Sequence, residues 1–246
     1  MSSTVAVPSL GEYSRRLTVN LDQHHVTVRP IVKGAVKEAA HTLTEAYINN
    51  AVVGWRANET GRSEQHDSFL FTLFKKIINE ATLTSRDFAI QVDGCKGILI
   101  WRIVGCWPSS INGTLKLARL IGWTAALRTW SKFQPSCDKV RRRVLGSCGR
   151  QFLSIGYLGV LPHEQHRGYG TALMQHVLDK ADDAHYYVYA EVSDERTLGF
   201  FTQFGFTVRA EMNISPSSTT FLLIRDPVLR DEPVSLQVQP GRSKSS

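Results

Sequence analysis

Hydrophobic residues in the first half of the chain alternate between a two-residue spacing and a helical spacing. The stretch VTVRPI over 26–31 alternates like a strand, and 33–47 then carries apolar side chains three and four residues apart. A second helical pattern covers 70–78. Asp93-Gly94, a strong turn signal, separates two strand-like runs, DFAIQVD and GCKGILIWRIVG. The pattern predicts a strand, two helices and a hairpin.

The second half returns to alternating strands and helices after a segment of different character. Residues 107–150 have helical spacing, and we interpret them as an insertion between the third and fourth strands. The predicted elements that follow are a strand over 151–161, a helix over 169–181, a strand over 186–193, a short helix over 194–204 and a hairpin turning at 215–218. This order predicts an α/β domain with a mixed sheet, whose strand–helix–strand unit supplies the parallel part.

Both ends of the chain lack sustained periodicity and are rich in Ser, Pro, Gln and charge. We expect flexible tails over 1–25 and 227–246, which leaves a folded domain over 26–226. The 246 residues suit one enlarged domain or two small ones. No apolar run approaches the ~18 residues of a membrane span, and no secretory signal is visible at the N-terminus. Its Ser-rich, acid-poor composition leaves a mitochondrial presequence open.

Cysteine usage and net charge narrow the chemical setting. The cysteines at 95, 106, 137 and 148 are too far apart for CxxC pairs and too few for a disulfide scaffold, which favours a reducing, cytoplasmic protein without a metal site. The net charge of +7 attracts anions. The basic run from Lys139 to Arg143 suits a solvated helix face, a phosphate contact or a nucleic-acid contact, and no nucleic-acid-binding motif accompanies it. We expect neither nucleic acid nor membrane as partner.

One segment carries the clearest chemical signal. In YLGVLPHEQHRGYGTALM, a strand ends at Leu161-Pro162, and Gly168 and Gly170 lie at the start of the next helix. Glycines there let backbone N–H groups approach a diphosphate, and the helix dipole favours the negative charge. The segment lacks the Gly-Lys-Ser/Thr of a Walker A loop and the GxGxxG of a dinucleotide site. We therefore expect a phosphorylated ligand of another class.

This segment resembles the acetyl-CoA signature of the GNAT superfamily of N-acetyltransferases, L-x-V-x-P-x-x-Q/R-x-x-G-x-G/A. Its six fixed positions are Leu158, Val160, Pro162, Gln165, Gly168 and Gly170, and Gly205-Phe206 matches the end of the family's second signature. The resemblance covers about 26–226 and is most similar to the puromycin N-acetyltransferase type, through the long insertion and the strand end Glu191-Val192-Ser193. It implies a single GNAT-like domain with a mixed, mostly antiparallel sheet flanked by helices.

The resemblance also implies acetyl-CoA as cosubstrate and a set of residues that bind it. Backbone groups of Leu158, Gly159 and Val160 would bond the pantetheine arm and polarise the thioester carbonyl, with Gly159 relieving crowding. The pyrophosphate would be held by Gln165, His166, Arg167, Gly168, Tyr169, Gly170 and Thr171. His163 and His166 suit solvated or phosphate-contacting roles better than a catalytic one.

One departure from the family concerns the proton donor for the thiolate leaving group. The family tyrosine should fall at position 201, where this chain has Phe201, and the usual Glu after it is Thr202. A thiol has an ordinary pKa near 8.5, so loss of this acid need not abolish transfer. The phenols of Tyr157, Tyr169, Tyr187 and Tyr189 are open alternatives.

Glu191 is our candidate for the general base. Strand alternation puts it on one face with Tyr187 and Tyr189, while the alternative interpretation is an ordinary solvated or structural carboxylate. In the family the acceptor site is walled by the first two helices and their loop, which makes Tyr47 and Trp55 candidate substrate-binding residues.

The resemblance implies an acetyl-CoA-dependent N-acetyltransferase, and we expect it to act on a small-molecule amine, for example in detoxification or secondary metabolism. We expect a monomer or homodimer. Two alternatives stay open, an acyl-CoA-binding GNAT-fold protein with weak or no catalysis, and a protein lysine or N-terminal acetyltransferase.

Overall fold

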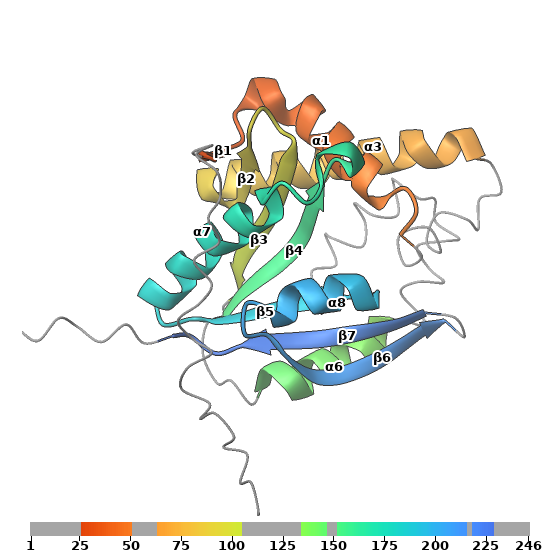
Figure 1. The fold of residues 1–246 in the computed structure, drawn as a ribbon. Helices are drawn as coiled ribbons and strands as arrows, with labels where there is room; N and C mark the ends of the chain where they lie inside the picture. The colour runs from red at the N-terminus through yellow and green to blue at the C-terminus, as the bar shows by residue number, and fades with distance from the viewer. Residues whose placement is uncertain (1–25, 51–62, 105–133, 147–151, 216–217, 229–246) are drawn as a thin grey trace, which may run out of the picture.

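Seven strands form a single mixed sheet in the order β1-β2-β3-β4-β5-β7-β6 (Figure 1). The computed structural model describes residues 26–50, 63–104, 134–146, 152–215 and 218–228. The strands are β1 Val28–Pro30, β2 Ala89–Val92, β3 Gly97–Val104, β4 Phe152–Val160, β5 Tyr187–Val192, β6 Thr207–Ser215 and β7 Ser218–Arg225. All neighbouring strands are antiparallel except β4 and β5. The predicted mixed, mostly antiparallel sheet is confirmed.

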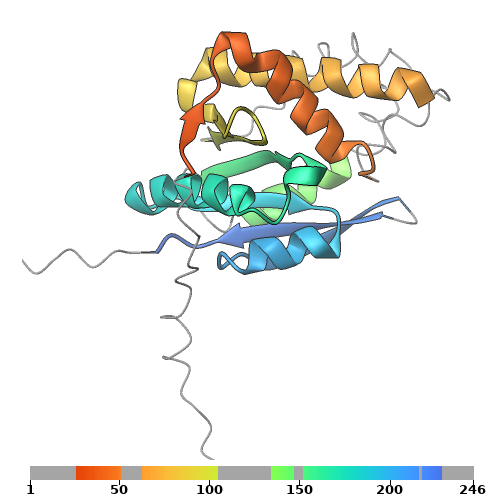
Figure 2. The same ribbon diagram turned by 45° about the horizontal axis from the view of Figure 1, so that its top comes forward.

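Helices cover both faces of this sheet. They are α1 Val36–Tyr47, α3 Ser63–Thr84, α6 Gln134–Gly146, α7 Tyr169–Asp183 and α8 Glu195–Thr202, with short 3₁₀ turns at Lys33–Ala35, Arg86–Phe88 and Pro162–Glu164. Helices α1 and α3 lie side by side on one face (Figure 2), and α6 lies on the same side against β5, β6 and β7. Helices α7 and α8 pack on the other face. The apolar stripes predicted for these helices form the core, because each faces the sheet.

The predicted insertion between β3 and β4 is partly described. Helix α6 lies in it, whereas 105–133 and 147–151 fall outside the described residues, as do 1–25 and 229–246 of the predicted tails. Residues 227 and 228 are described, and the N–H of Val228 donates to Asp182 on α7. None of the described helices is long and apolar enough to cross a membrane.

The strands β4 and β5 separate after a short parallel ladder. They pair only from Phe152 to Ser154 on β4 and from Tyr187 to Tyr189 on β5. Beyond this point, β4 stays with β3 and β5 stays with β7. The β3–β4 register also skips Gly156, which forms a bulge, and a bulge bends its strand. The sheet is therefore open between the carboxyl ends of β4 and β5.

A buried ion pair fastens the last strand to α7. The guanidinium of Arg225 donates to both carboxylate oxygens of Asp182, at 2.7 and 2.9 Å, and its Nε donates to the carbonyl of Phe204. Both charged side chains are less than a tenth exposed. The pair joins β7, α7 and the turn after α8.

Candidate active site

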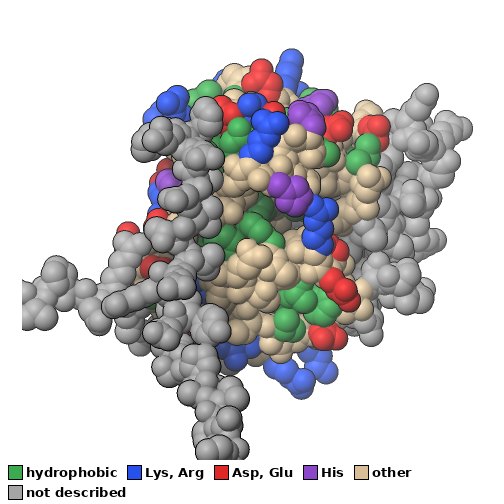
Figure 3. Space-filling view, viewed as in Figure 1, with side chains coloured by type: hydrophobic (Ala, Val, Ile, Leu, Met, Phe, Trp, Pro, Cys, Tyr) green, Lys and Arg blue, Asp and Glu red, His purple; other side chains and the backbone are tan. Residues whose placement is uncertain are grey.

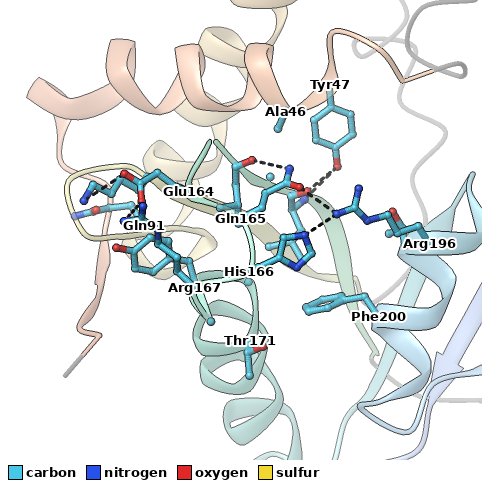
Figure 4. Close-up of a pocket in the computed structure, with 18 of the residues that line it drawn as sticks. Ala46, Tyr47, Gln91, Glu164, Gln165, His166, Arg167, Thr171, Arg196 and Phe200 are labelled. Atoms are coloured by element: carbon cyan, nitrogen blue, oxygen red, sulfur yellow. Dashed lines mark hydrogen bonds and ion pairs between the residues drawn. The ribbon is translucent and has the colours of Figure 1, made fainter. Parts of the chain in front are cut away.

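A cleft of about 1820 Å³ opens where β4 and β5 separate. It is walled by the ends of both strands, the last turn of α1, the β2–β3 turn and the first turns of α7 and α8 (Figure 4). Figure 3 shows a histidine and a basic side chain together on this face of the molecule. The residues expected to bind the donor all line the cleft, namely Leu158, Gly159, Val160, Gln165, His166, Arg167, Gly168, Tyr169, Gly170 and Thr171. Tyr47 and Glu191 line it as well.

The loop between β4 and α7 presents backbone N–H groups without a side-chain cap. Gly168 precedes the first residue of α7, has a left-handed backbone with φ of 81°, and no side chain caps this helix start. His166 also has a positive φ of 63°. First-turn N–H groups have no acceptor within their own helix, and the helix dipole favours an anion beside them. The loop therefore fits the phosphate-binding role predicted from its glycines.

A charged network connects this loop to the β2–β3 turn. Asp93 accepts hydrogen bonds of 2.7 Å from both Lys96 and the Tyr169 hydroxyl. Glu164 lies 2.9 Å from Arg167 and 3.7 Å from Lys96. The hydrogen bond to Asp93 is the main reason that the pKa values of Lys96 and Tyr169 lie above their ordinary values. The network holds the loop against the hairpin and engages the Tyr169 hydroxyl with Asp93.

The edge of β4 that faces the open part of the sheet is occupied by Tyr47. The Tyr47 hydroxyl accepts from the Leu158 N–H at 3.3 Å and donates to the Leu158 carbonyl at 3.2 Å. Leu158 lies opposite Leu99 in the antiparallel β3–β4 pair, and its two bonds to Tyr47 show that its backbone groups point away from β3. Those of the next residue, Gly159, then point toward Ile98 on β3. We correct the expectation that the Gly159 backbone bonds the donor, because β3 takes its hydrogen bonds.

Gly159 has a different structural role. Its missing side chain lies on the face of β4 that packs against α1, where Leu43 and Ala46 come closest. The crowding that Gly159 relieves is therefore that between helix and strand. On the open edge, Val160 follows Leu158, and its carbonyl accepts a long hydrogen bond of 3.4 Å from the Gln165 amide.

Glu191 lies on β5 across the opening from β4. The predicted alternation is confirmed, because Val188, Ala190 and Val192 pack in the core under α7 and α8 while Tyr189 faces α6. The Glu191 side chain is half-buried and lines the cleft. The Tyr189 hydroxyl donates to its carboxylate at 2.5 Å. A carboxylate held in this way can accept a proton from a group bound in the cleft.

The two residues expected at the acceptor site differ in what the structure describes. Tyr47 lines the cleft, whereas Trp55 lies in 51–62, outside the described residues. The described wall beside Tyr47 is polar, and the Asn50 amide donates to the Ser193 hydroxyl at 3.4 Å. These polar residues were not predicted, because apolar positions at helical spacing indicate a helix face and not the polar residues beside it.

The position of the absent family tyrosine lies in the core. Phe201 is 4% exposed and packs against Phe206, with ring centroids 5.0 Å apart, whereas its neighbour Phe200 lines the cleft. Of the four alternative phenols, only Tyr169 lines the cleft, and Asp93 engages its hydroxyl. The phenol at the open edge of β4 is Tyr47.

Arg196, on α8, was not predicted and connects the two sides of the cleft. Its guanidinium donates to His166 Nε2 at 2.9 Å and to the Gln165 amide oxygen at 3.5 Å (Figure 4). The Nε2 atom of His166 therefore has the Arg196 guanidinium as its partner in the structure. No local sequence signal identifies Arg196, because the contact joins residues 30 positions apart.

Comparison with known families agrees with this geometry. Residues 102–206, which include β4, the glycine loop, α7, β5 and α8, match the family model described as acetyltransferase (GNAT) family. This part of the chain is therefore similar to the GNAT family of acetyltransferases. Within the part of the chain that the structure describes, no group of three His, Cys, Asp or Glu side chains could hold a metal ion.

Individual known proteins are similar to this chain over most of its length. An uncharacterized N-acetyltransferase of Schizosaccharomyces pombe is 22% identical over 199 residues, which cover 78% of this chain and 79% of the relative. The solved structure of arylalkylamine N-acetyltransferase 2 from Aedes aegypti covers 82% of this chain and 99% of its own, with 11% identity and a TM-score of 0.57. A histone acetyltransferase HPA2-related structure from Corynebacterium glutamicum covers 84% of this chain and 99% of its own, with 16% identity and a TM-score of 0.56. The two structures show the shared fold.

Proposed function

We propose that the protein is an acetyl-CoA-dependent N-acetyltransferase that acts on a small-molecule amine. The observation that carries the proposal is a single cleft in which the open edge of β4, the uncapped loop before α7 and the Glu191 carboxylate all meet. A flexible amide-containing donor with a diphosphate needs the first two features, and an attacking ammonium group needs a proton acceptor such as the third.

The residues present fit the donor. The backbone of Leu158 and Val160 would hold the amide arm by strand-like hydrogen bonds, and the loop from Gln165 to Thr171 would hold the phosphates. When bound, acetyl-CoA supplies the activated acetyl group. The protein's contribution is to hold the donor and the amine in contact and to exclude competing water.

Glu191 is the group that we assign to proton removal. An amine is protonated at neutral pH and must lose a proton before it can attack a carbonyl carbon. The carboxylate of Glu191 lies at the end of β5, across the split from Leu158, and Tyr189 fixes its orientation. The same end of the cleft holds Asn50 and Ser193, which offer hydrogen bonds to a polar acceptor.

The small-molecule acceptor is the finer part of the proposal. It is consistent with the arylalkylamine acetyltransferase named for the Aedes aegypti structure, whereas the Corynebacterium glutamicum structure is named for a histone acetyltransferase. The puromycin-type subgroup, the cytoplasmic location and the monomeric or dimeric state also stay predictions.

Calorimetric titration with acetyl-CoA and a thiol-release assay over a panel of amines and peptides test the proposal. We expect saturable binding, and thiol release that depends on a small amine. Binding without thiol release would support an acyl-CoA-binding protein, and release only with peptides would support a protein acetyltransferase. A Gly168→Glu variant should lose binding because the added carboxylate would lie in the phosphate loop, whereas Gly168→Asn, which tolerates a positive φ, should retain most of it.

A further inference from the structure

The Tyr47 hydroxyl occupies the hydrogen-bonding positions that a donor chain would need. Past the last β4–β5 pair, the N–H and C=O of Leu158 have lost their strand partner. Both are instead bonded to one hydroxyl, which comes from a helix 111 residues away in the sequence. An extended amide chain added to this edge would use the same N–H and C=O groups.

A neutral phenol suits this double contact. It must accept from the Leu158 N–H and donate to the Leu158 carbonyl at once, which a phenolate cannot do. Burial raises the pKa of Tyr47 above its ordinary value, so the hydroxyl keeps its proton at physiological pH. The ring is held by edge-on or tilted contacts with Phe74 and Tyr157, at centroid distances of 5.5 and 5.8 Å.

A second side chain bonds a backbone group further along the open edge of β4. Gln165 donates to the carbonyl of Val160, two residues further along β4. Two side chains of this chain therefore cover three of the four backbone groups that Leu158 and Val160 direct into the split. A free strand edge is costly when it is shielded from water, and these contacts reduce the cost while the cleft holds no partner.

We propose that Tyr47 is an internal competitor for the acyl donor, bonded to Leu158 until the donor's amide chain displaces it. This inference rests on the proposed function, because it takes the open edge of β4 as the donor site. Tyr47 is the last residue of α1, beyond which the helical hydrogen bonding ends. Its side chain can therefore leave Leu158 without disrupting the body of the helix. Displacement makes donor affinity weaker than the edge alone would allow.

The test compares acetyl-CoA binding to the wild-type chain and to Tyr47→Phe by calorimetry. Phe keeps the aromatic ring but leaves the Leu158 groups without a partner, so we expect Kd to fall about three- to tenfold. The control is Tyr157→Phe, which alters a neighbouring phenol that does not line the cleft and should change Kd less than about twofold. An unchanged or higher Kd for Tyr47→Phe, with binding by the wild type intact, overturns the inference alone.

Amide hydrogen exchange without ligand gives a second readout. The Leu158 amide should exchange faster in Tyr47→Phe than in the wild type, and acetyl-CoA should slow it in both proteins. Equal exchange in the two unliganded proteins would contradict the contact itself. If neither protein binds acetyl-CoA, the proposed function fails and the inference fails with it. Binding by Tyr47→Phe alone would be the strongest support for competition.

Discussion

A Cβ atom placed on Gly159 would lie 2.8 Å from the Cβ of Ala46, closer than real Cβ contacts occur. It would also lie 2.9 Å from the side chain of Leu43. Because both neighbours sit on α1, the absence of a side chain at Gly159 sets how near this helix can come to β4. That distance in turn determines whether Tyr47 reaches Leu158.

Replacing Gly159 with alanine should therefore destabilise the protein. The new methyl group overpacks the α1–β4 contact, and overpacking of this kind costs roughly 1–3 kcal/mol. Urea denaturation measures the change in the free energy of unfolding. Gly170→Ala is the matched control, since its Cβ would make only ordinary contacts, with the Phe200 ring at 3.5 Å and Val160 at 3.9 Å. Equal stability of the two variants would show that α1 can move away without cost.

Glu191→Gln should impair turnover without impairing donor binding. Loss of a general base typically lowers the rate by about 10²- to 10⁴-fold. We expect such a fall in kcat/KM for amine acetylation, with the Kd of acetyl-CoA within about twofold of wild type. Glu195→Gln removes a nearby carboxylate outside the cleft lining and should have little effect. A Glu191→Gln enzyme with full kcat/KM across pH would leave the structural interpretation of this carboxylate.

Asp182→Asn should be one of the most destabilising single changes in the domain. It leaves the buried Arg225 guanidinium without its carboxylate, and breaking a buried pair in this way costs about 3–5 kcal/mol. Asp87→Asn removes the partner of Lys180 in a half-exposed pair and should cost less than about 1 kcal/mol. Thermal and urea unfolding of both variants measure the contrast. A similar small loss for both would mean that Arg225 finds another partner.

Alkaline pH should weaken the charged network at the β2–β3 turn. The folded-state pKa values of Lys96 and Tyr169 are raised, mainly by hydrogen bonds to Asp93. The unfolded chain therefore loses these protons first, so the network's contribution is present below about pH 10 and is lost as the pH rises through the folded-state values. Urea unfolding between about pH 9 and 11.5 should show a shallower loss for Asp93→Asn than for the wild type. Parallel curves would refute the coupling.

Local patterns were sufficient to predict the elements and the donor loop. Turn residues and helix starts depend on neighbours in the sequence, so Asp93-Gly94 and Gly168 identified the hairpin and the start of α7. The face of β5 on which the Glu191 side chain lies follows from the two-residue period of the strand. The isolated Gly156 inside a strand pattern is a local signal for the bulge.

Contacts between distant segments could not be predicted in this way. Tyr47 and Leu158 are 111 residues apart, and Arg196 meets His166 only after α7 and β5 have turned the chain back. Periodicity says which face a side chain occupies but not what lies opposite it. The expected role of the Gly159 backbone came from the family resemblance, and the pairing of Gly159 with Ile98 on β3 is visible only in the sheet register.

Because β4 and β5 pair over only three residues, the sheet consists of two parts that are joined by a short parallel ladder. One part contains β1 to β4 with α1 and α3, and the other contains β5 to β7 with α6. Helix α7 follows β4 and precedes β5, and it packs against strands of both parts, so it connects them. A molecule bound in the cleft between β4 and β5 would make a second connection between the two parts of the sheet. Ligand binding in the cleft should therefore also stabilise the arrangement of the two parts of the sheet.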